Sequence, residues 1–301
     1  MLKVAVLMSM YNGEKFLQVQ MDSLLTQQGV DVTIFVRDDG SHDASVSIVE
    51  SFVTKHHNVR LFTGKNIGIV QSFVTLVELA GEDFDFYALC DQDDYWKPKK
   101  LMSAVNFLTE KNNNQPLLYC SALEYVDTEL TYSGRSRKKM QPSFGNALVE
   151  NIVTGCTSVF NRQLRALIIQ HRPRNAVMHD WWMYLLATAF GEVVFDPTPH
   201  IKYRQHANNV IGATPRFLPL WRRRLGVVLS REIIISVLQV EEFNNYYGNQ
   251  LENEKRTLIR RFLQRKENKW SRWLLVISTG ITKQKILDTI AVRVLILLGW
   301  Y

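Results

Sequence analysis

Short apolar runs alternate with helical patterns over the first third of the chain. The strand-like runs are 2–7, 31–37, 59–62 and 84–90, and the helical patterns between them are 14–27, 44–55 and 69–80. Helices of about 10–15 residues between buried strands are typical of βαβ units, whose strands run parallel and whose crossovers are right-handed. The order therefore predicts an α/β fold, in which a mainly parallel twisted sheet carries helices on both faces.

Three carboxylates follow the last of these strands. The apolar run that begins at Phe84 ends at Cys90, and Asp91, Asp93 and Asp94 come directly after it. In open α/β sheets, ligands bind at the carboxyl ends of the strands. Carboxylates this close together repel one another, and a cation that prefers oxygen ligands, Mg²⁺ or Mn²⁺, relieves the repulsion and keeps positions for phosphate. The spacing favours a metal site, and the alternative is a solvated acidic turn.

The earlier strands also end in polar turns. These turns span 9–14, 38–41 and 63–68, and a parallel sheet would place them at the same edge as 91–94. Four such turns at one edge indicate a single crevice. The first turn holds only Gly13, so the GxGxxG pattern of a dinucleotide-binding loop is absent. We therefore expect phosphates to be held through a metal ion rather than by a glycine loop.

Basic residues are concentrated at the C-terminal end. Residues 214–301 carry 16 Lys and Arg against 7 Asp and Glu, whereas 1–213 carry 20 against 22. The asymmetry predicts two functional regions, a domain over 1–213 and a basic amphipathic helical region over 214–301. The N-terminus has only about eight apolar residues before polar ones return, which indicates a first strand rather than a signal peptide. The three cysteines form no CxxC pair, which fits buried thiols in a reducing, cytoplasmic compartment.

The basic region has the pattern of helices that lie on a surface. Helical patterns cover 220–247, 249–266 and 284–299, and Trp, Arg and aliphatic residues are mixed in 269–277. No apolar run approaches the ~20 residues of a membrane span. Basic amphipathic helices with Trp favour a peripheral position on an anionic membrane surface, here the inner face of the cell membrane. The alternative is packing against the domain formed by 1–213 or a homodimer contact. A nucleic-acid partner is disfavoured, because the domain formed by 1–213 is slightly acidic.

The order and spacing of these turns resemble glycosyltransferase family 2, over residues 3 to about 210. The matching strings are VLMSMYNGEKFL, VRDDGSHD, NIGIVQSF, CDQDDYW, TGCTSVFNR, MHDWW and YRQHANN. The resemblance implies a GT-A type, Rossmann-like fold for a nucleotide sugar, made of two abutting α/β halves. Within the family, CDQDDYW and HDWW resemble bacterial rhamnosyltransferases that build cell-wall or capsular polysaccharide.

The resemblance implies a donor site and a metal site. Asp39 would accept a hydrogen bond from the imide of a uracil or thymine ring, which fits UDP or dTDP better than a purine nucleotide. Asp91, Asp93 and His206 would hold the metal, with Asp94 as a structural acid. The positions implied for donor binding are Tyr11, Asn12, Glu14, Asp39, Asn66, Gly68, Asp91 and Arg204. A purely local role in turns and helix starts is the alternative for these side chains.

The acceptor half of the site is implied farther along the chain. Asp180, at the start of the apolar helix 181–190, would be the catalytic base that takes a proton from a sugar hydroxyl. Its alternative is a helix N-cap, a role that Asp fills well. Residues 155–158 would form a strand that lines the acceptor cleft, and Asn161 would cap the next helix. The positions implied for acceptor binding are Gly155, Cys156, Thr157, His179, Trp181 and Trp182, with core packing as their alternative.

Together these features predict an inverting, metal-dependent glycosyltransferase with Mg²⁺ or Mn²⁺ as its cofactor. The expected donor is a nucleotide sugar, dTDP-L-rhamnose by resemblance or a UDP-hexose. The expected acceptor is a saccharide, lipid-linked, in bacterial surface polysaccharide synthesis. A sugar-nucleotide pyrophosphorylase is disfavoured, because residues 8–16 lack a Gly- and Lys-rich loop. A catalytically silent scaffold of a polysaccharide assembly complex is the alternative from another class, and the presence of Asp39, Asp91, Asp93 and Asp180 together argues against it.

Overall fold

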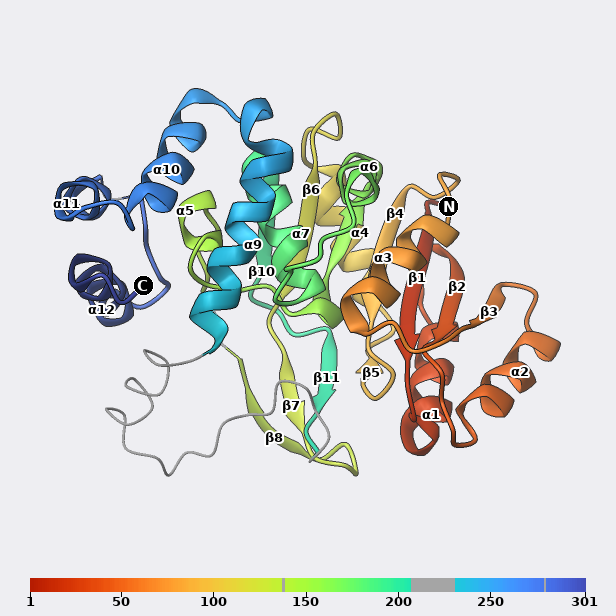
Figure 1. The fold of residues 1–301 in the computed structure, drawn as a ribbon. Coiled ribbons are helices and arrows are strands. Elements are labelled where there is room, and N and C mark those ends of the chain that lie inside the picture. The colour runs from red at the N-terminus through yellow and green to blue at the C-terminus, as the bar shows by residue number, and fades with distance from the viewer. Residues whose placement is uncertain (137–138, 207–230, 279) are drawn as a thin grey trace. The chain divides into compact units, whose positions relative to one another are not determined.

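The structure is a computed structural model that describes residues 1–136, 139–206, 231–278 and 280–301 (Figure 1). The chain forms two compact units. The first comprises 1–139, 153–172 and 191–213, and the second comprises 140–152, 173–190 and 214–301. The second unit therefore includes two segments from the middle of the chain, in addition to the basic C-terminal region expected from the charge asymmetry.

A seven-stranded sheet forms the centre of the first unit, with the strand order β10-β6-β9-β4-β1-β2-β3. Its strands are β1 (Lys3–Met10), β2 (Asp31–Asp38), β3 (Val59–Thr63), β4 (Phe86–Cys90), β6 (Leu117–Ser121), β9 (Val159–Asn161) and β10 (Glu192–Asp196). Neighbouring strands pair in parallel except at β9, which is antiparallel to β4 and β6. The mainly parallel sheet predicted from the sequence is confirmed. Because β1 pairs with both β2 and β4, the turns that follow these three strands are neighbours at the carboxyl edge.

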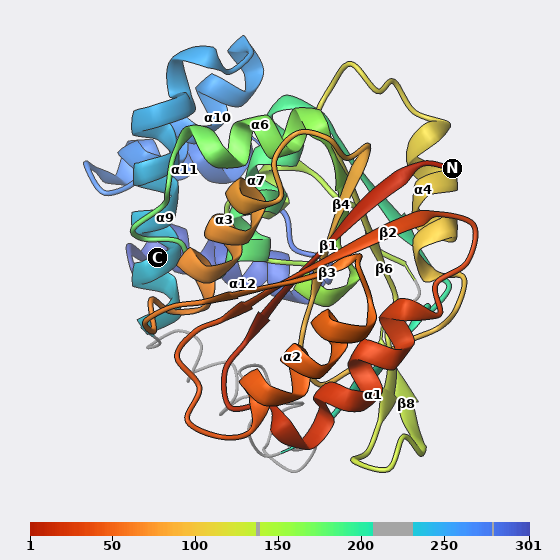
Figure 2. The same cartoon turned by 90° about the vertical axis from the view of Figure 1, so that its right-hand side faces the viewer.

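Helices cover both faces of this sheet (Figure 2). On one face, α1 (Glu14–Leu25), α2 (Ser45–Lys55) and α4 (Lys100–Thr109) share a core with strand residues such as Val4 and Val6. On the other face, α3 (Ile69–Leu79) and α6 (Arg162–Gln170) pack together and against the strands, and the intervening residue Ala5 is also fully buried. Successive strand residues point to opposite faces, so burial on both faces explains why these strands are continuous apolar runs.

A smaller four-stranded sheet belongs to the same unit. Its order is β5-β11-β7-β8, with β5 (Tyr95–Trp96), β7 (Glu124–Val126), β8 (Tyr132–Arg135) and β11 (Ile201–Arg204). β11 pairs antiparallel with β5, and Lys202 lies opposite Tyr95. Because β5 begins directly after Asp94, this pairing brings Arg204 and the residues that follow it back to the acidic turn.

The strand expected at residues 155–158 is wrong. Gly155–Thr157 forms a 3₁₀ turn, η1, and only β9 is extended. The turn is closed by hydrogen bonds from Thr157 N to Thr154 O at 2.9 Å and from Ser158 N to Gly155 O at 2.9 Å. The expected cap is confirmed, because the Asn161 side chain accepts a hydrogen bond from Leu164 N at the start of α6.

The second unit is helical. Its elements are α5 (Phe144–Ala147), α7 (His179–Phe190), α9 (Arg231–Tyr247), η2 (Gly248–Gln250), α10 (Asn253–Gln264), α11 (Lys269–Ile277) and α12 (Ile286–Leu298). Its core includes aromatic contacts among Trp182, Phe190, Phe243 and Tyr247. These rings join α7 to α9, which explains why a segment from the middle of the chain belongs with the C-terminal helices.

Helices occur where the sequence predicts them in the C-terminal region. The patterns at 249–266 and 284–299 form α10 and α12 with slightly shorter bounds. The first part of the expected helix 220–247, with Trp221, lies outside the described residues. In the part of the chain that the structure describes, no helix has the length and apolar character needed to cross a membrane.

Candidate functional site

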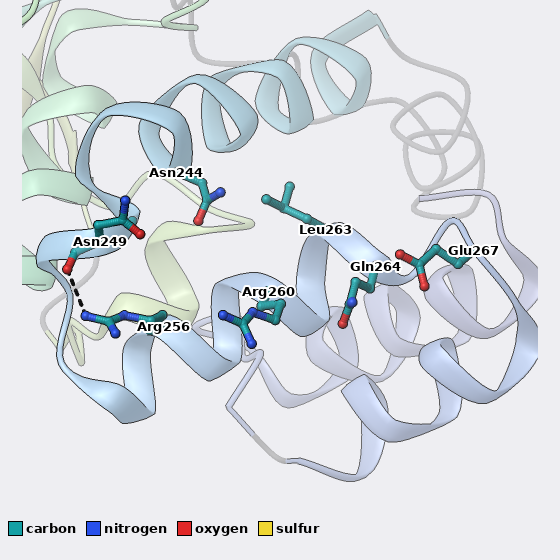
Figure 3. Close-up of a pocket in the computed structure, with 8 residues that line it drawn as sticks. Asn244, Asn249, Arg256, Arg260, Leu263, Gln264 and Glu267 are labelled. Carbon is teal, nitrogen blue, oxygen red and sulfur yellow. Dashed lines mark hydrogen bonds between the residues drawn. The ribbon is translucent and has the colours of Figure 1, made fainter.

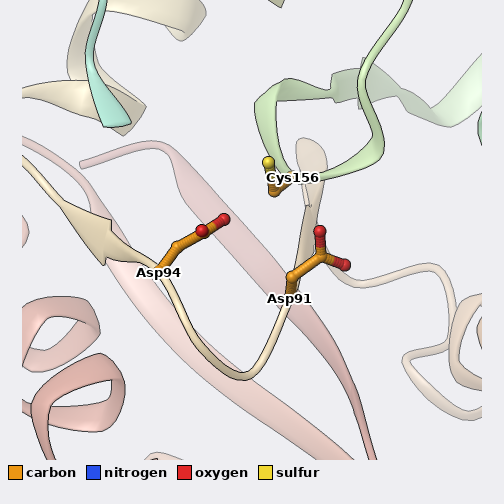
Figure 4. Close-up of side chains that lie close together, drawn as sticks. All are labelled: Asp91, Asp94 and Cys156. Carbon is orange, nitrogen blue, oxygen red and sulfur yellow. The ribbon is translucent and has the colours of Figure 1, made fainter. Parts of the chain in front are cut away.

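The acidic turn lies between β4 and β5, at the carboxyl end of β4. Asp91 and Asp94 project from the two arms of the turn toward η1, which carries Cys156 (Figure 4). One possible ligand atom from each of these three residues lies within 4.8 Å of the other two. The two carboxylates therefore converge on one small volume.

Asp94 is the most buried of the three acids. Its side chain has no exposed surface, and Oδ1 accepts a hydrogen bond from the Arg204 backbone N–H at 3.1 Å. Among the described residues, no nitrogen or oxygen donor reaches Oδ2. Burial, followed by the charges of Asp93 and Asp91, raises the pKa of Asp94 well above its ordinary value. A nearby cation would relieve the same repulsion.

Asp93 contacts a histidine that is distant in sequence. Asp93 Oδ2 and His206 Nε2 lie 2.7 Å apart, and the imidazole stacks on Phe16 with ring centroids 5.0 Å apart. Arg204 Nε donates to Asp93 O at 2.8 Å, its guanidinium also donates to Thr128 O, and it lies 4.6 Å from the Phe16 ring centroid. Arg204 therefore fixes the backbone of the acidic turn while His206 contacts a carboxylate within it.

The side chains around this turn fit a divalent cation that prefers oxygen ligands. Asp91 and Asp93 offer carboxylate oxygens, and His206 offers an imidazole nitrogen. Burial and then the charges of Asp94 and Asp91 raise the pKa of the Cys156 thiol. Cys156 lies next to the carboxylates of Asp91 and Asp94. Carboxylate oxygens are the ligands in this set that suit Mg²⁺ or Mn²⁺.

Hydrogen bonds join the polar turns to one another. Gln92 accepts from Tyr11 N at 2.8 Å and donates to Tyr11 O at 3.1 Å, which fastens the first turn to the acidic turn. Asn12, at φ 48°, donates from its backbone N–H to Ser41 Oγ and accepts from His42 N. The turn after β1 is therefore held by the turns after β4 and β2.

The starts of α1 and α2 are also linked. Glu14 Oε2 accepts from Ala44 N at 2.9 Å, and Asp43 Oδ2 accepts from Glu14 N at 3.1 Å. Each carboxylate thus satisfies an N–H near the start of the other helix, where acidic side chains are favourable. Glu14 thus links the starts of α1 and α2.

Asp39 is 4% exposed and holds the turn after β3. Its Oδ1 accepts from Ile67 N at 2.9 Å, and its Oδ2 accepts from Gly68 N at 3.0 Å. Arg37 donates to Oδ1 as well, and its second amino group donates to Lys65 O at 3.1 Å. Both oxygens of Asp39 therefore have protein donors.

The turns after β2 and β3 pack closely through a glycine. Gly40 has φ +85°, and a Cβ placed there would lie 3.2 Å from the backbone nitrogen of Asn66. The Asn66 side chain in turn accepts from Gly68 N at 3.2 Å. Residues Asn66 and Gly68 are therefore held against the Asp39 turn, as parts of one wall.

A buried lysine close to this cluster was not foreseen. Lys100 is 1% exposed, and its Nζ lies 3.3 Å from the centroid of the Trp96 ring without a hydrogen-bond partner among the described residues. Burial lowers the pKa of Lys100 to about 7, against the opposing influence of Cys90, Cys156 and Asp94. Its burial could have been predicted from helical spacing. Position 100 precedes the buried Ala104 and Leu108 by four and eight residues, which places all three on one face of α4.

The predicted base belongs to the second unit. Asp180 lies in the first turn of α7, is 3% exposed and accepts a hydrogen bond from Asn151 Nδ2 through Oδ1 at 3.0 Å. The adjacent His179 is buried, which lowers its pKa to about 3 and keeps its imidazole neutral near pH 7.

The two tryptophans of α7 differ in their surroundings. Trp181 is partly exposed, and its Nε1 donates to Ala147 O at 2.7 Å. Trp182 is 1% exposed and packs against Phe243 and Tyr247. Trp182 thus has the core role that was the alternative to sugar stacking.

The predicted site residues divide between the two units. The first unit contains the predicted donor and metal residues together with Gly155, Cys156 and Thr157, all three of which are buried. The second unit contains Asp180 and its neighbours in α7. The residues that the sequence did not single out are Phe16, Gln92 and Lys100, although Gln92 lies within the acidic string itself.

A polar pocket of about 360 Å³ lies in the second unit between α9 and α10 (Figure 3). Its lining includes Asn244, Arg256 and Arg260, and Arg256 donates to Asn249 O. None of the predicted site residues lines this pocket.

Curated relatives align with most of the chain. The dTDP-rhamnosyl transferase RfbG of Shigella flexneri is 28% identical over 264 residues, which cover 81% of this chain and 88% of that protein. An uncharacterized glycosyltransferase of Rickettsia typhi is 24% identical over 246 residues, which cover 77% of this chain and 74% of that protein.

Solved structures share the fold at low sequence identity. The S. aureus TarS fragment 1–349 in complex with UDP-GlcNAc has a TM-score of 0.57 at 15% identity, covering 100% of this chain and 91% of that chain. The mannosyltransferase PcManGT from Pyrobaculum calidifontis, in complex with GDP-Man and Mn²⁺, has a TM-score of 0.51 at 14% identity, covering 98% and 86%. The fold is thus of the GT-A type. The model of Glycosyl transferase family 2 matches residues 5–171, more than half of the chain, and the chain belongs to this family.

Proposed function

We propose that this glycosyltransferase is an inverting, metal-dependent enzyme that moves L-rhamnose from dTDP-L-rhamnose to a saccharide acceptor. The observation that carries the proposal is the acidic turn at the sheet edge, where Asp91 and Asp94 converge and Asp93 contacts His206. The rhamnosyl donor is supported by the relative in Shigella flexneri that is named a dTDP-rhamnosyl transferase. The acceptor is a lipid-linked saccharide in bacterial surface polysaccharide synthesis.

In this proposal the first unit binds the donor. Asp39 and the wall formed by Asn66 and Gly68 hold the pyrimidine ring, with a remaining lone pair of Asp39 accepting from the imide N–H. The turn that carries Tyr11 and Asn12, with Glu14 after it, lies against the nucleoside. Arg204 holds the acidic turn in the shape needed to receive the diphosphate.

The residues that we propose as ligands of a divalent cation, Mg²⁺ or Mn²⁺, are Asp91, Asp93 and His206. When bound, it supplies positive charge to the diphosphate leaving group. Asp94 supports these ligands through its hydrogen bond with Arg204 N, and Cys156 lies beside Asp91 and Asp94.

The proposed base is Asp180. Its carboxylate takes the proton of the acceptor hydroxyl as the oxygen attacks the anomeric carbon, and the bond from that carbon to the phosphate oxygen breaks in the same step. The nucleoside diphosphate leaves from the opposite face, so the anomeric configuration inverts. Asn151 donates to Asp180 Oδ1 and orients the carboxylate. Trp181, the partly exposed tryptophan of α7, is available to contact an acceptor sugar.

Donor turnover with and without EDTA tests the roles of the two carboxylates. We expect EDTA, Asp93→Ala and Asp180→Ala each to lower turnover by about 10² to 10⁴-fold, because each removes charge stabilisation or proton transfer. Asp83→Ala is the control, since Asp83 is exposed and lies in the same unit as Asp93. Full activity of either site variant would overturn the role assigned to that residue.

A thermal-shift panel of UDP, GDP and dTDP sugars with Mn²⁺ or Mg²⁺ tests the donor. At equal concentration, the ligand that binds the folded state most tightly raises the melting temperature most, so dTDP-L-rhamnose should give the largest shift. A larger shift with a UDP-hexose contradicts the rhamnosyl assignment, and donor binding without transfer to any acceptor would identify a silent scaffold.

We also propose that the enzyme works on the cytoplasmic side of the cell membrane as a peripheral protein. The support is the lipid-linked acceptor and the basic C-terminal region, in which residues 253–301 carry 11 Lys and Arg against 3 Asp and Glu. A homodimer contact through the same region is the alternative.

A further inference from the structure

The outer face of helix α12 is apolar along the whole helix. Six large side chains there are between 41% and 79% exposed: Ile286, Leu287, Ile290, Val294, Leu297 and Leu298. At about 100° per residue, they lie within an arc of about 120° on the helix, and no charged residue lies in that arc. We refer to these six residues as the α12 outer face.

The opposite face of α12 is packed. Val292, Leu295 and Ile296 are all at most 9% exposed. The helix ends in a closed cap, in which Gly299 N donates to Ile296 O at 3.1 Å and Trp300 N donates to Leu295 O at 2.9 Å. The helix is therefore anchored by its inner face and its end, and fraying does not explain the exposure of its outer face.

The neighbouring helix α11 also exposes large apolar side chains. Trp270, Trp273 and Ile277 are 64%, 46% and 49% exposed, and the two indole rings stack with centroids 5.0 Å apart. Their spacing places them within an arc of about 60° on one side of α11. Trp300, directly after the cap of α12, is exposed as well. Indole rings combine an apolar body with a polar N–H and are enriched at membrane–water interfaces.

We propose that the α12 outer face and the exposed tryptophans of α11 insert into the interfacial layer of an anionic membrane. The flanking charge fits this occupant, because Lys269 and Lys285, at the starts of the two helices, are exposed. Polybasic segments next to an apolar helix face gain from both apolar burial and attraction to anionic headgroups. The inference rests on the proposed function, in which the acceptor is lipid-linked.

Charge disfavours a second copy of this chain as the occupant. Residues 253–301 carry 11 basic and 3 acidic side chains, so a symmetric contact would bring two strongly positive segments together. An anionic bilayer instead neutralises this charge.

Co-sedimentation with vesicles tests the surface. The probes are vesicles of phosphatidylcholine with and without phosphatidylglycerol, and the test variant is Ile290→Glu with Val294→Glu. The control, Val19→Glu with Val53→Glu, adds the same charge at exposed apolar positions of α1 and α2. We expect the unmodified protein to bind the anionic vesicles, the test variant to bind about tenfold more weakly, and the control to bind like the unmodified protein. Lys269→Gln with Lys285→Gln should also weaken binding and reduce its salt dependence.

Several results would overturn this inference. One is that the unmodified protein does not bind the vesicles, and another is that the test and control variants bind them equally. A third is that sedimentation velocity shows a dimer of the unmodified protein and of the control variant but a monomer of the test variant. Sugar transfer to a soluble acceptor, measured without vesicles, separates the two proposals. Vesicle binding without any transfer supports the surface while contradicting the proposed function, whereas transfer without vesicle binding overturns the surface alone.

Discussion

His206 Nε2 lies 2.7 Å from Asp93 Oδ2, although Asp93 follows β4 and His206 follows β11. Two features fix this contact. The imidazole stacks on Phe16, and the pairing of β11 with β5 returns the chain to the acidic turn. The histidine is therefore positioned before any ligand binds, which reduces the cost of ordering it.

Replacement of His206 should weaken the response to metal without unfolding the protein. We expect His206→Gln to lower the apparent affinity for Mn²⁺ by about 10 to 100-fold, as measured by titration of activity and by calorimetry. His57→Gln is the matched control, because His57 is exposed in the same unit. An unchanged Mn²⁺ titration for His206→Gln would exclude His206 from the metal site.

Gln92 is expected to contribute both to the free energy of unfolding and to the binding of the donor. Gln92→Ala removes two hydrogen bonds to the Tyr11 backbone, worth about 0.5–1.5 kcal/mol each. We expect a lower free energy of unfolding in urea and a higher KM for the donor, because the turn after β1 is no longer hydrogen-bonded to the acidic turn. Gln18→Ala, at an exposed glutamine that bonds only Asp22, should change neither quantity. Equal effects from both variants would mean that the Tyr11 contact has no special role.

Lys100 should make the stability of the protein depend on pH. Its folded pKa of about 7 lies below the unfolded value of about 10.4, so the unfolded state binds more protons between these values. Its destabilising effect is complete below pH 7, on the order of 4 kcal/mol, and disappears as the pH rises toward 10. Lys100→Met keeps the side-chain length and removes the charge.

We therefore expect Lys100→Met to be more stable than the unmodified protein at pH 7 and similar to it near pH 10. The difference in unfolding free energy between the two proteins isolates Lys100 from other titrating groups. Lys99→Met is the control, because Lys99 is exposed and adjacent. A difference that does not vary with pH would show that Lys100 has an ordinary pKa.

Gly145 tests the packing of the second unit. A Cβ at Gly145 would lie 1.8 Å from Gly280 O, so Gly145→Ala must displace the backbone between α11 and α12. We expect a loss of more than about 2 kcal/mol in unfolding free energy. Gly134→Ala, where the nearest atom to a Cβ is 3.6 Å away on the Tyr125 side chain, should cost much less. Similar losses in both variants would argue against a close contact at Gly145.

Much of the first unit could be predicted from local patterns. The runs that end at Cys90 and begin at Val59 form strands, and the pattern from Glu14 forms a helix, because period and flanking turns agree. The 3₁₀ turn at Gly155 was missed, because a short apolar run does not distinguish a strand from a tight turn. The prediction that the polar turns lie together rested on the binding of ligands at the carboxyl ends of parallel strands and on the family resemblance. His206 was assigned to the metal site by that resemblance, and its contact with Asp93 was not specified by the sequence.

The amino-acid sequence by itself determined the alternating order of strands and helices, the acidic turn, and the basic character of the C-terminal region. These features depend on neighbours in the chain, and local propensity and spacing encode them. The tertiary structure decided which distant side chains meet: Gln92 with Tyr11, Asp39 with Gly68, and Lys100 with Trp96. It also decided that residues 140–152 and 173–190 join the C-terminal helices. The physical reason is that strand order and helix packing are set by burial of surfaces far apart in the chain, and no local pattern records that pairing.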